Sequence, residues 1–211
     1  ILLTAEPHQC VPRGVPRVPQ DCRMGNEPSY DVIVAGGGPG GSVAAKLCSE
    51  AGFTTLLIEQ KKLPRDKVCT GMVMGSWAHE IIRQEFGEIP ESVLVNPPRL
   101  QGHRLHVSGT VSRTLEWQTP LTWRKNLDFW MLQHARQAGV TVWEASQVVR
   151  VRQGKGATSV AVRQHGATHE LRARFVIGAD GSLSAVRKSL FPELRVRYSS
   201  PRRECYVGQV D

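Results

Sequence analysis

The chain has 211 residues, of which 40% are hydrophobic and 22% charged, and this composition excludes collagen-like and intrinsically disordered proteins. No apolar run approaches the roughly 20 residues that a membrane-spanning helix needs. The 27 Lys and Arg residues exceed the 19 Asp and Glu residues, and the net charge of +8 would suit a nucleic-acid or anionic-membrane surface.

Four arginines of the basic second half favour a different explanation of this charge. Arg150, Arg152, Arg172 and Arg174 alternate with Val or Ala at the period of a β-strand. Alternation of this kind predicts solvated strand faces, so we expect no nucleic-acid partner. Peripheral contact with a membrane stays open as an alternative.

The five cysteines are an odd number without a CxxC pair, so we expect neither a disulfide framework nor a zinc site. His103 and His106 have HxxH spacing but no nearby carboxylate cluster, so no metal site is expected there. Residues 1–28 contain five of the 13 prolines and are predicted to be a disordered extension or linker. They have neither a basic start nor an A-x-A cleavage pattern, which favours a cytoplasmic protein.

Residues 30–59 predict a compact βαβ unit. A short apolar strand at 30–35 leads into a glycine-rich turn, a helix at 42–51 ends at Gly52, and a second strand at 54–58 ends in Glu59. Gly36, Gly38 and Gly41 within the turn match GxGxxG.

The three glycines each have a physical task at a nucleotide site. The first permits a tight turn, the second permits backbone to approach a pyrophosphate, and the third permits the helix to pack on the strand. Pro39 and Gly40 lie in the same turn, at a helix N-terminus whose free N–H groups favour phosphate. Glu59 can accept both hydroxyls of an adenosine ribose and would repel a 2′-phosphate, so the pattern favours FAD or NAD over NADP.

Three further elements are predicted before residue 140. Ser76 is expected to cap a helix that runs to Phe86 and places Trp77, Ile81 and Ile82 on one side. Residues 105–107 and 111–117 alternate around a Ser-Gly-Thr turn and predict a hairpin. Asn126 is expected to cap a helix that ends at Gly139. The buried residues of that helix are expected to be Leu127, Trp130, Met131, Ala135 and Ala138. Trp117, Trp123 and Trp143 are expected to fill the core with Trp130.

The last third of the chain predicts more strands. Residues 140–143 are a third candidate parallel strand, and three short alternating runs form a β-meander that leads into residues 175–179. The turn at 180–182 then opens a helix to about residue 190. A new strand is expected at 205–210.

Residues 177–187 carry a second signature, Ile-Gly-Ala-Asp-Gly-Ser-Leu-Ser-Ala-Val-Arg. Asp180 ends a strand, Gly181 permits a sharp turn, Ser184 can cap the helix and Arg187 lies in its first turn. With the GxGxxG unit, this stretch resembles the flavoprotein superfamily of aromatic hydroxylases and geranylgeranyl reductases. The resemblance implies FAD as cofactor, with Asp180, Gly181 and Arg187 near it and near a reduced nicotinamide nucleotide.

Residues 64–71, Pro-Arg-Asp-Lys-Val-Cys-Thr-Gly, are similar to the Pro-x-x-Lys-x-Cys-Gly segment of geranylgeranyl reductases. The resemblance implies that Cys69 faces the substrate cavity and that Gln60, Arg65 and Lys67 lie near the cofactor. Two cations close in sequence would favour the thiolate of Cys69. A buried, inert cysteine is the alternative.

Further cofactor contacts implied by the resemblance come from Arg124, which matches an arginine in an Arg-x-x-Leu-Asp pattern, and from Val148. The family also has a late Gly-Asp turn, and no Gly-Asp dipeptide occurs in these 211 residues. We therefore expect an incomplete substrate domain.

The predicted fold is an α/β, Rossmann-like FAD-binding domain of the glutathione-reductase type with a β-meander. It would span residues 29–192, with a substrate-domain insertion around 97–122 and the start of a truncated substrate domain at 193–211. The implied activity is reduction of C=C bonds in a prenyl or other hydrophobic small molecule, with NAD(P)H as a candidate electron donor. The alternatives are a flavin monooxygenase or halogenase, and a non-catalytic basic module that binds nucleic acid or a membrane surface.

Overall fold

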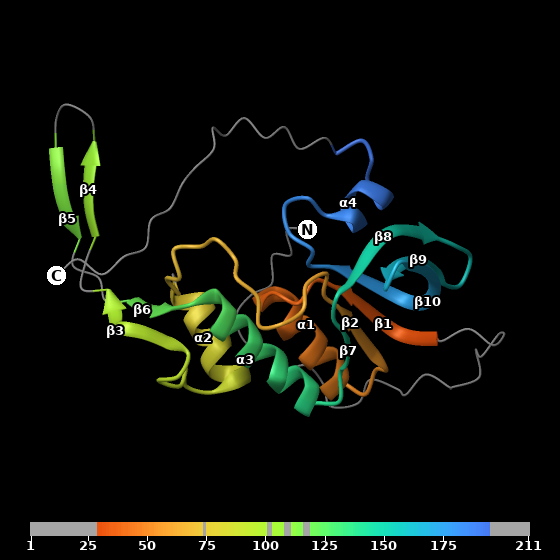
Figure 1. Cartoon of the computed structure of the whole chain (residues 1–211), viewed down its shortest axis with the longest axis horizontal. Coiled ribbons are helices and arrows are strands. Elements are labelled where there is room, and N and C mark those ends of the chain that lie inside the picture. The colour runs from red at the N-terminus through yellow and green to blue at the C-terminus, as the bar shows by residue number, and fades with distance from the viewer. Residues whose placement is uncertain (1–28, 74, 101–102, 108–110, 116–118, 195–211) are drawn as a thin grey trace, which may run out of the picture.

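The computed structural model describes residues 29–73, 75–100, 103–107, 111–115 and 119–194. Its centre is a six-stranded sheet in the order β7-β2-β1-β10-β9-β8 (Figure 1). The strands in chain order are β1 (Ser29–Ala35), β2 (Thr55–Ile58), β7 (Thr141–Trp143), β8 (Ser146–Gln153), β9 (Thr158–Gln164) and β10 (Ala167–Gly178). β7, β2, β1 and β10 are parallel neighbours, whereas β8, β9 and β10 pair antiparallel. The predicted α/β sheet with a third parallel strand and a β-meander is confirmed.

Alternate residues of β1 point to opposite faces of the sheet and pack against two different layers. Val32 and Val34 pack toward helices α1 (Pro39–Glu50) and α3 (Arg124–Gln137), in a cluster that includes Ala45 and Leu132. Ile33 lies in the opposite cluster, with meander residues and with α4 (Ala185–Leu190). The near-continuous apolar strands follow from this burial on both faces.

The sequence predicts a separate strand after the meander, but in the structure the last meander strand and the last parallel strand are one. The third meander run and residues 175–178 form one continuous strand, β10, which pairs with β9 along one part and with β1 along the other. Arg150, Arg152 and Arg172 are exposed while Val151 and Ala173 are buried, so the predicted solvated strand faces are confirmed there.

The segment between β2 and α3 carries helix α2 (Ser76–Phe86) and two small antiparallel sheets. β3 (Leu94–Leu100) pairs with β6 (Thr119–Thr122), and β4 (His103–Val107) pairs with β5 (Val111–Leu115) as the predicted hairpin. Gly75, rather than Ser76, occupies the N-cap position of α2. Trp77 and Ile81 are exposed and only Ile82 of the predicted apolar side is buried, against Phe86 and Met131.

The start of α3 differs from the prediction. Its N-cap is Trp123, and the Asn126 amide donates to the Ser92 carbonyl oxygen at 3.3 Å instead of capping the helix. Trp123 is 48% exposed and does not fill the core as predicted, whereas Trp130 and Trp143 are half-buried against it. Leu127, Met131 and Ala135 are buried as expected.

Several expectations fall outside the described part of the chain: the strand at 205–210, Trp117, and three of the cysteines, Cys10, Cys22 and Cys205. The side chains of His103 and His106 are not described either. Cys48 and Cys69 are free thiols. Among the described residues, no group of three or more His, Cys, Asp or Glu could hold a metal ion, and no helix is long and apolar enough to cross a membrane.

Candidate cofactor site

The glycine turn between β1 and α1 is closely packed at its first and third glycines. Gly36 has φ +106°, and a Cβ there would lie 2.4 Å from the Ala179 carbonyl oxygen. A Cβ on Gly41 would lie 1.8 Å from the Gly36 carbonyl oxygen, so the helix packs directly on the turn. Gly38 is different, because a Cβ there would meet only the tips of two side chains, Nη2 of Arg124 at 3.8 Å and Nη2 of Arg65 at 4.0 Å. Two guanidinium groups therefore approach the open space beside Gly38.

A cavity of about 580 Å³ opens at the carboxyl ends of the parallel strands, between the glycine turn, the segment after β2, the start of β8 and the 179–183 turn. This position is where open parallel sheets bind ligands. The sequence-predicted residues that line it are Gly36, Gly38, Pro39, Gly40, Glu59, Gln60, Arg65, Lys67, Arg124, Val148, Asp180 and Gly181. Gly41 packs below the turn instead, and Arg187 does not line the cavity.

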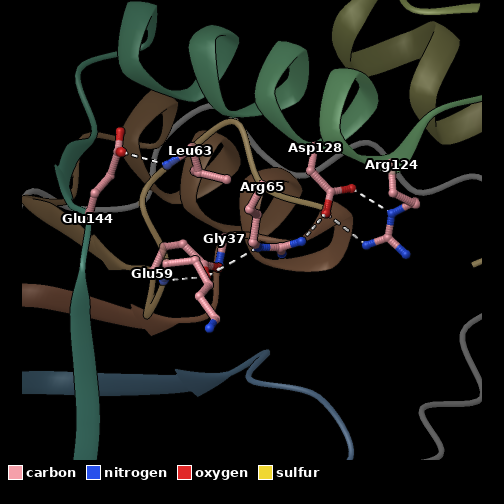
Figure 2. A network of polar contacts seen from close by, with 8 residues as sticks. Gly37, Glu59, Leu63, Arg65, Arg124, Asp128 and Glu144 are labelled. Atoms are coloured by element: carbon pink, nitrogen blue, oxygen red, sulfur yellow. Dashed lines mark hydrogen bonds and ion pairs between the residues drawn. The ribbon is translucent and has the colours of Figure 1, made fainter. Parts of the chain in front are cut away.

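Glu59 is 3% exposed at the end of β2, and its carboxylate is held on three sides. Oε2 accepts the Gly37 N–H at 2.9 Å, and Oε1 accepts the Lys61 N–H at 2.9 Å and Nε of Arg65 at 3.3 Å (Figure 2). The acid thus fixes the glycine turn to the loop after β2. Its position in the cavity lining is compatible with the predicted ribose contact.

Asp128, on the first turns of α3, links the two arginines that approach Gly38. It accepts Nε and Nη2 of Arg124 at 2.7 and 2.9 Å, and its Oδ2 lies 3.1 Å from Nη1 of Arg65 (Figure 2). Asp128 itself is fully buried. Sequence reasoning did not single it out; the one available signal was the Asp that closes the Arg-x-x-Leu-Asp pattern.

The turn after β10 is built by two caps on α4. Oδ2 of Asp180 accepts the N–H groups of Ala185 at 2.6 Å and Val186 at 3.3 Å. Ser184 Oγ accepts the Arg187 N–H at 2.9 Å, which confirms Ser184 as the N-cap. The Arg187 guanidinium donates to the carbonyl oxygens of Leu194 and Ser182, so it stabilises the ends of this corner and leaves Lys188 in the cavity lining.

Cys69 lies in a smaller cavity of about 300 Å³, which shares Asp66, Lys67 and Arg124 with the larger one. Val95, Leu121 and Trp123 supply much of its apolar lining. Gly71 makes the turn beside Cys69, and its carbonyl oxygen accepts the N–H of Thr122 at 2.9 Å and the hydroxyl of Thr122 at 3.0 Å. These bonds hold the cysteine loop against β6.

The pKa of the Cys69 thiol lies below its ordinary value. Burial raises this pKa. Hydrogen bonds from the Gly71 N–H and from the Arg124 guanidinium, together with the charge of Arg124, lower the pKa by more than burial raises it. The sequence predicted this direction from Arg65 and Lys67, whereas the guanidinium that lowers the pKa in the structure is that of Arg124. Arg124 comes from a segment more than fifty residues away in sequence.

This geometry predicts the alkylation behaviour of two thiols. The thiolate is the reactive form, so Cys69 should react with iodoacetamide with its half-maximal rate at a lower pH than Cys48, whose pKa is raised by burial. Peptide mass spectrometry after timed alkylation separates the cysteines. Arg124→Gln should shift the Cys69 profile to higher pH and leave that of Cys48 unchanged. A Cys69 profile at or above that of Cys48 would contradict the Arg124 contact.

A diphosphate-bearing cofactor fits these residues. Nη2 of Arg65 and Nη2 of Arg124 lie beside the open space at Gly38, whereas Nη1 of Arg65 lies 3.1 Å from Oδ2 of Asp128. A phosphate oxygen in this space would accept charge-assisted hydrogen bonds from the two guanidinium groups. No side chain caps the N-terminus of α1, whose N–H groups also favour an anion. The fold and the site together define a dinucleotide-binding domain.

Comparison with known proteins identifies the kind of dinucleotide. Residues 29–200 match the family described as FAD binding domain, and the chain belongs to that family. It is 32% identical over 174 residues to digeranylgeranylglycerophospholipid reductase 1 of Methanopyrus kandleri, covering 78% of this chain and 44% of that protein. The chain thus spans less than half the length of this curated relative.

Two solved structures support the same assignment. The geranylgeranyl bacteriochlorophyll reductase-like protein of Thermoplasma acidophilum aligns with TM-score 0.61 and 27% identity, over 72% of this chain and 39% of that one. A myxobacterial FAD-dependent chondrochloren halogenase aligns with TM-score 0.60 and 25% identity, over 76% of this chain and 39% of that one. The predicted resemblance to the reductase and hydroxylase superfamily is confirmed.

Proposed function

We propose that this chain is the cofactor-binding part of an FAD-dependent oxidoreductase that reduces C=C bonds of a prenyl or other hydrophobic substrate. The observation that carries the proposal is the pair of adjoining cavities. Asp66, Lys67 and Arg124 line both, so the space over Gly38 and the apolar space at Cys69 share one wall. The names of the Methanopyrus and Thermoplasma relatives support a reductase of prenyl groups.

The chain's own residues would bind and orient the partners of this reaction. Gly38, Arg65 and Arg124 would bind the cofactor phosphates, and Glu59 would accept the adenosine ribose hydroxyls. The apolar lining near Cys69 would exclude water from the substrate. Bound FAD would supply the hydride, which amino-acid side chains do not donate.

NAD(P)H, or another reductant, is proposed as the electron source. Residues 29–192 are proposed as the FAD-binding domain, with the segment around 97–122 as a substrate-domain insertion and 193–211 as the start of the rest of the substrate domain. A cytoplasmic location with peripheral membrane contact stays a prediction, for which the substrate class and the exposed arginines on β8 and β10 are the support.

The experiment that tests the reaction type uses oxygen as the variable. A reductase needs no O₂, so the full-length protein should convert a prenyl substrate to a product two hydrogens heavier under strict anaerobiosis with dithionite or NADPH. Product mass is measured with and without air. Product that forms only in air and is heavier by one oxygen atom would overturn the reductase in favour of a monooxygenase.

The monooxygenase or halogenase alternative is supported by the similarity to the halogenase structure. A halogenase would likewise require air, and would also require a halide, which the same mass measurement detects. The non-catalytic alternative predicts binding to anionic polymers or vesicles with a steep dependence on salt and no bound flavin.

A further inference from the structure

Asp128 is a buried charge that does not line the cofactor cavity. It is fully buried on α3, and its two described ion-pair partners are Arg65, whose side chain is 12% exposed, and Arg124, whose side chain is 17% exposed. Burying a carboxylate costs free energy that its ion pairs recover only with good geometry. Its retention in the core of the site therefore calls for a role beyond packing.

The partners of Asp128 come from two distant segments and end at one place. Arg65 lies in the loop after β2, and Arg124 begins α3. Their Nη2 atoms lie 4.0 and 3.8 Å from the position that a Cβ on Gly38 would occupy. Two guanidinium groups brought this close repel one another unless a negative charge lies between them. Figure 2 shows Asp128 in that position, with Glu59 on the far side of Arg65.

The resulting row alternates in charge: Glu59, Arg65, Asp128, Arg124. Each arginine is fixed by at least one carboxylate, which lowers the loss of side-chain freedom when a ligand binds. Arg124 is held by two nearly parallel N–H···O bonds, a geometry that a lysine cannot reproduce.

We infer that Asp128 is a positioning residue that ties Arg65 and Arg124 into one anion-binding pair over Gly38, for the phosphates of the cofactor. This inference rests on the proposed binding of FAD. Asp128 acts only through the two arginines, so its contribution to ligand affinity disappears when they are no longer held.

A double-mutant cycle tests this coupling. The variants are Asp128→Asn, Arg124→Gln and both together, and the measurement is the dissociation constant for FAD by quenching of flavin fluorescence, with a thermal melt of each protein. Arg124→Gln should weaken FAD binding about tenfold or more in the otherwise unchanged chain, as expected for a lost charged hydrogen bond. In the Asp128→Asn background it should weaken binding by less than about twofold, because the guanidinium is already released.

A matched control is Glu144, which links Arg136 near the C-terminal end of α3 to Leu63 in the loop after β2. Glu144 accepts the Leu63 N–H at 2.8 Å (Figure 2) and pairs with Arg136, and neither Glu144 nor Arg136 lines the cofactor cavity. Glu144→Gln should lower the melting temperature while leaving FAD affinity and the effect of Arg124→Gln unchanged. If Asp128→Asn behaves like this control, the residue is merely structural and the inference is wrong.

Two conservative variants give a result if Asp128→Asn fails to fold. Arg65→Lys and Arg124→Lys retain the charge and most of the volume but lose the bridging geometry, so each should weaken FAD binding about tenfold. Wild-type affinity in both would overturn the inference. The cycle is repeated with inorganic pyrophosphate. If Asp128 and Arg124 are coupled in pyrophosphate binding but the protein does not bind FAD, the proposed function is wrong and the positioning role is supported. If the effects of the two substitutions are additive with both ligands, the positioning role is wrong.

Discussion

Gly38→Val is expected to abolish FAD binding while the protein stays folded. Gly38 has ordinary backbone angles, φ −82° and ψ −178°, and a Cβ there would meet nothing closer than the Arg124 guanidinium at 3.8 Å. The fold therefore has room for the side chain, but the added methyl groups occupy the space into which Arg65 and Arg124 point. A loss of affinity of about a hundredfold or more is expected, equal to about 2.7 kcal/mol.

Two measurements on the same sample check this result. Flavin retained after gel filtration reports binding, and a far-UV thermal melt reports folding. We expect a melt close to that of the flavin-free wild type. Wild-type flavin content in the valine variant would show that the cofactor does not pass over Gly38.

Gly41→Ala should have the opposite pattern, since it affects the fold first. The new Cβ would lie 1.8 Å from the Gly36 carbonyl oxygen and 3.4 Å from the Ala179 Cβ, so α1 has to move away from the turn. Overpacking against rigid backbone costs about 3 kcal/mol. For a domain of this size that lowers the melting temperature by about 6–12 °C.

The comparison of Gly41→Ala with Gly38→Ala makes the test specific. Both add one methyl group to the same turn, but only the first meets backbone within 3 Å. Chemical denaturation at fixed protein concentration measures each free energy of unfolding. Equal stability of the two alanine variants would contradict the packing of α1 on the glycine turn.

The glycine turn and Glu59 could be predicted from the sequence because their roles depend on local spacing. Gly36, Gly38 and Gly41 lie within one turn, and the strand after α1 brings Glu59 back beside them. The parallel strands could be predicted for a similar reason, since β-rich runs alternating with a helix have few ways to pair.

The contacts of the loop after β2 could not be predicted, since they depend on where the loop crosses the fold. Glu144 holds Leu63, and Gly71 is held by Thr122, so the loop passes beside the start of α3. That path brings Arg124 to Cys69 and Asp128 to Arg65.

Helix boundaries failed where tertiary contacts override local preference. Asn126 has the typical chemistry of an N-cap, but its amide bonds to Ser92, and the helix begins at Arg124. Arg187 lies in the first turn of α4 as predicted, yet its guanidinium turns to two carbonyl oxygens of the corner instead of the cavity.

The most direct test of the central claim is the identity of the cofactor bound by the wild-type protein. The purified chain is incubated with FAD and, separately, with NAD⁺ and NADP⁺, then freed of excess ligand, heat-denatured and assayed by mass spectrometry of the released nucleotide. The site of Gly38, Glu59, Arg65 and Arg124 predicts that FAD is retained in preference to both nicotinamide nucleotides. Retention of NAD⁺ or NADP⁺ with no bound FAD would contradict the account.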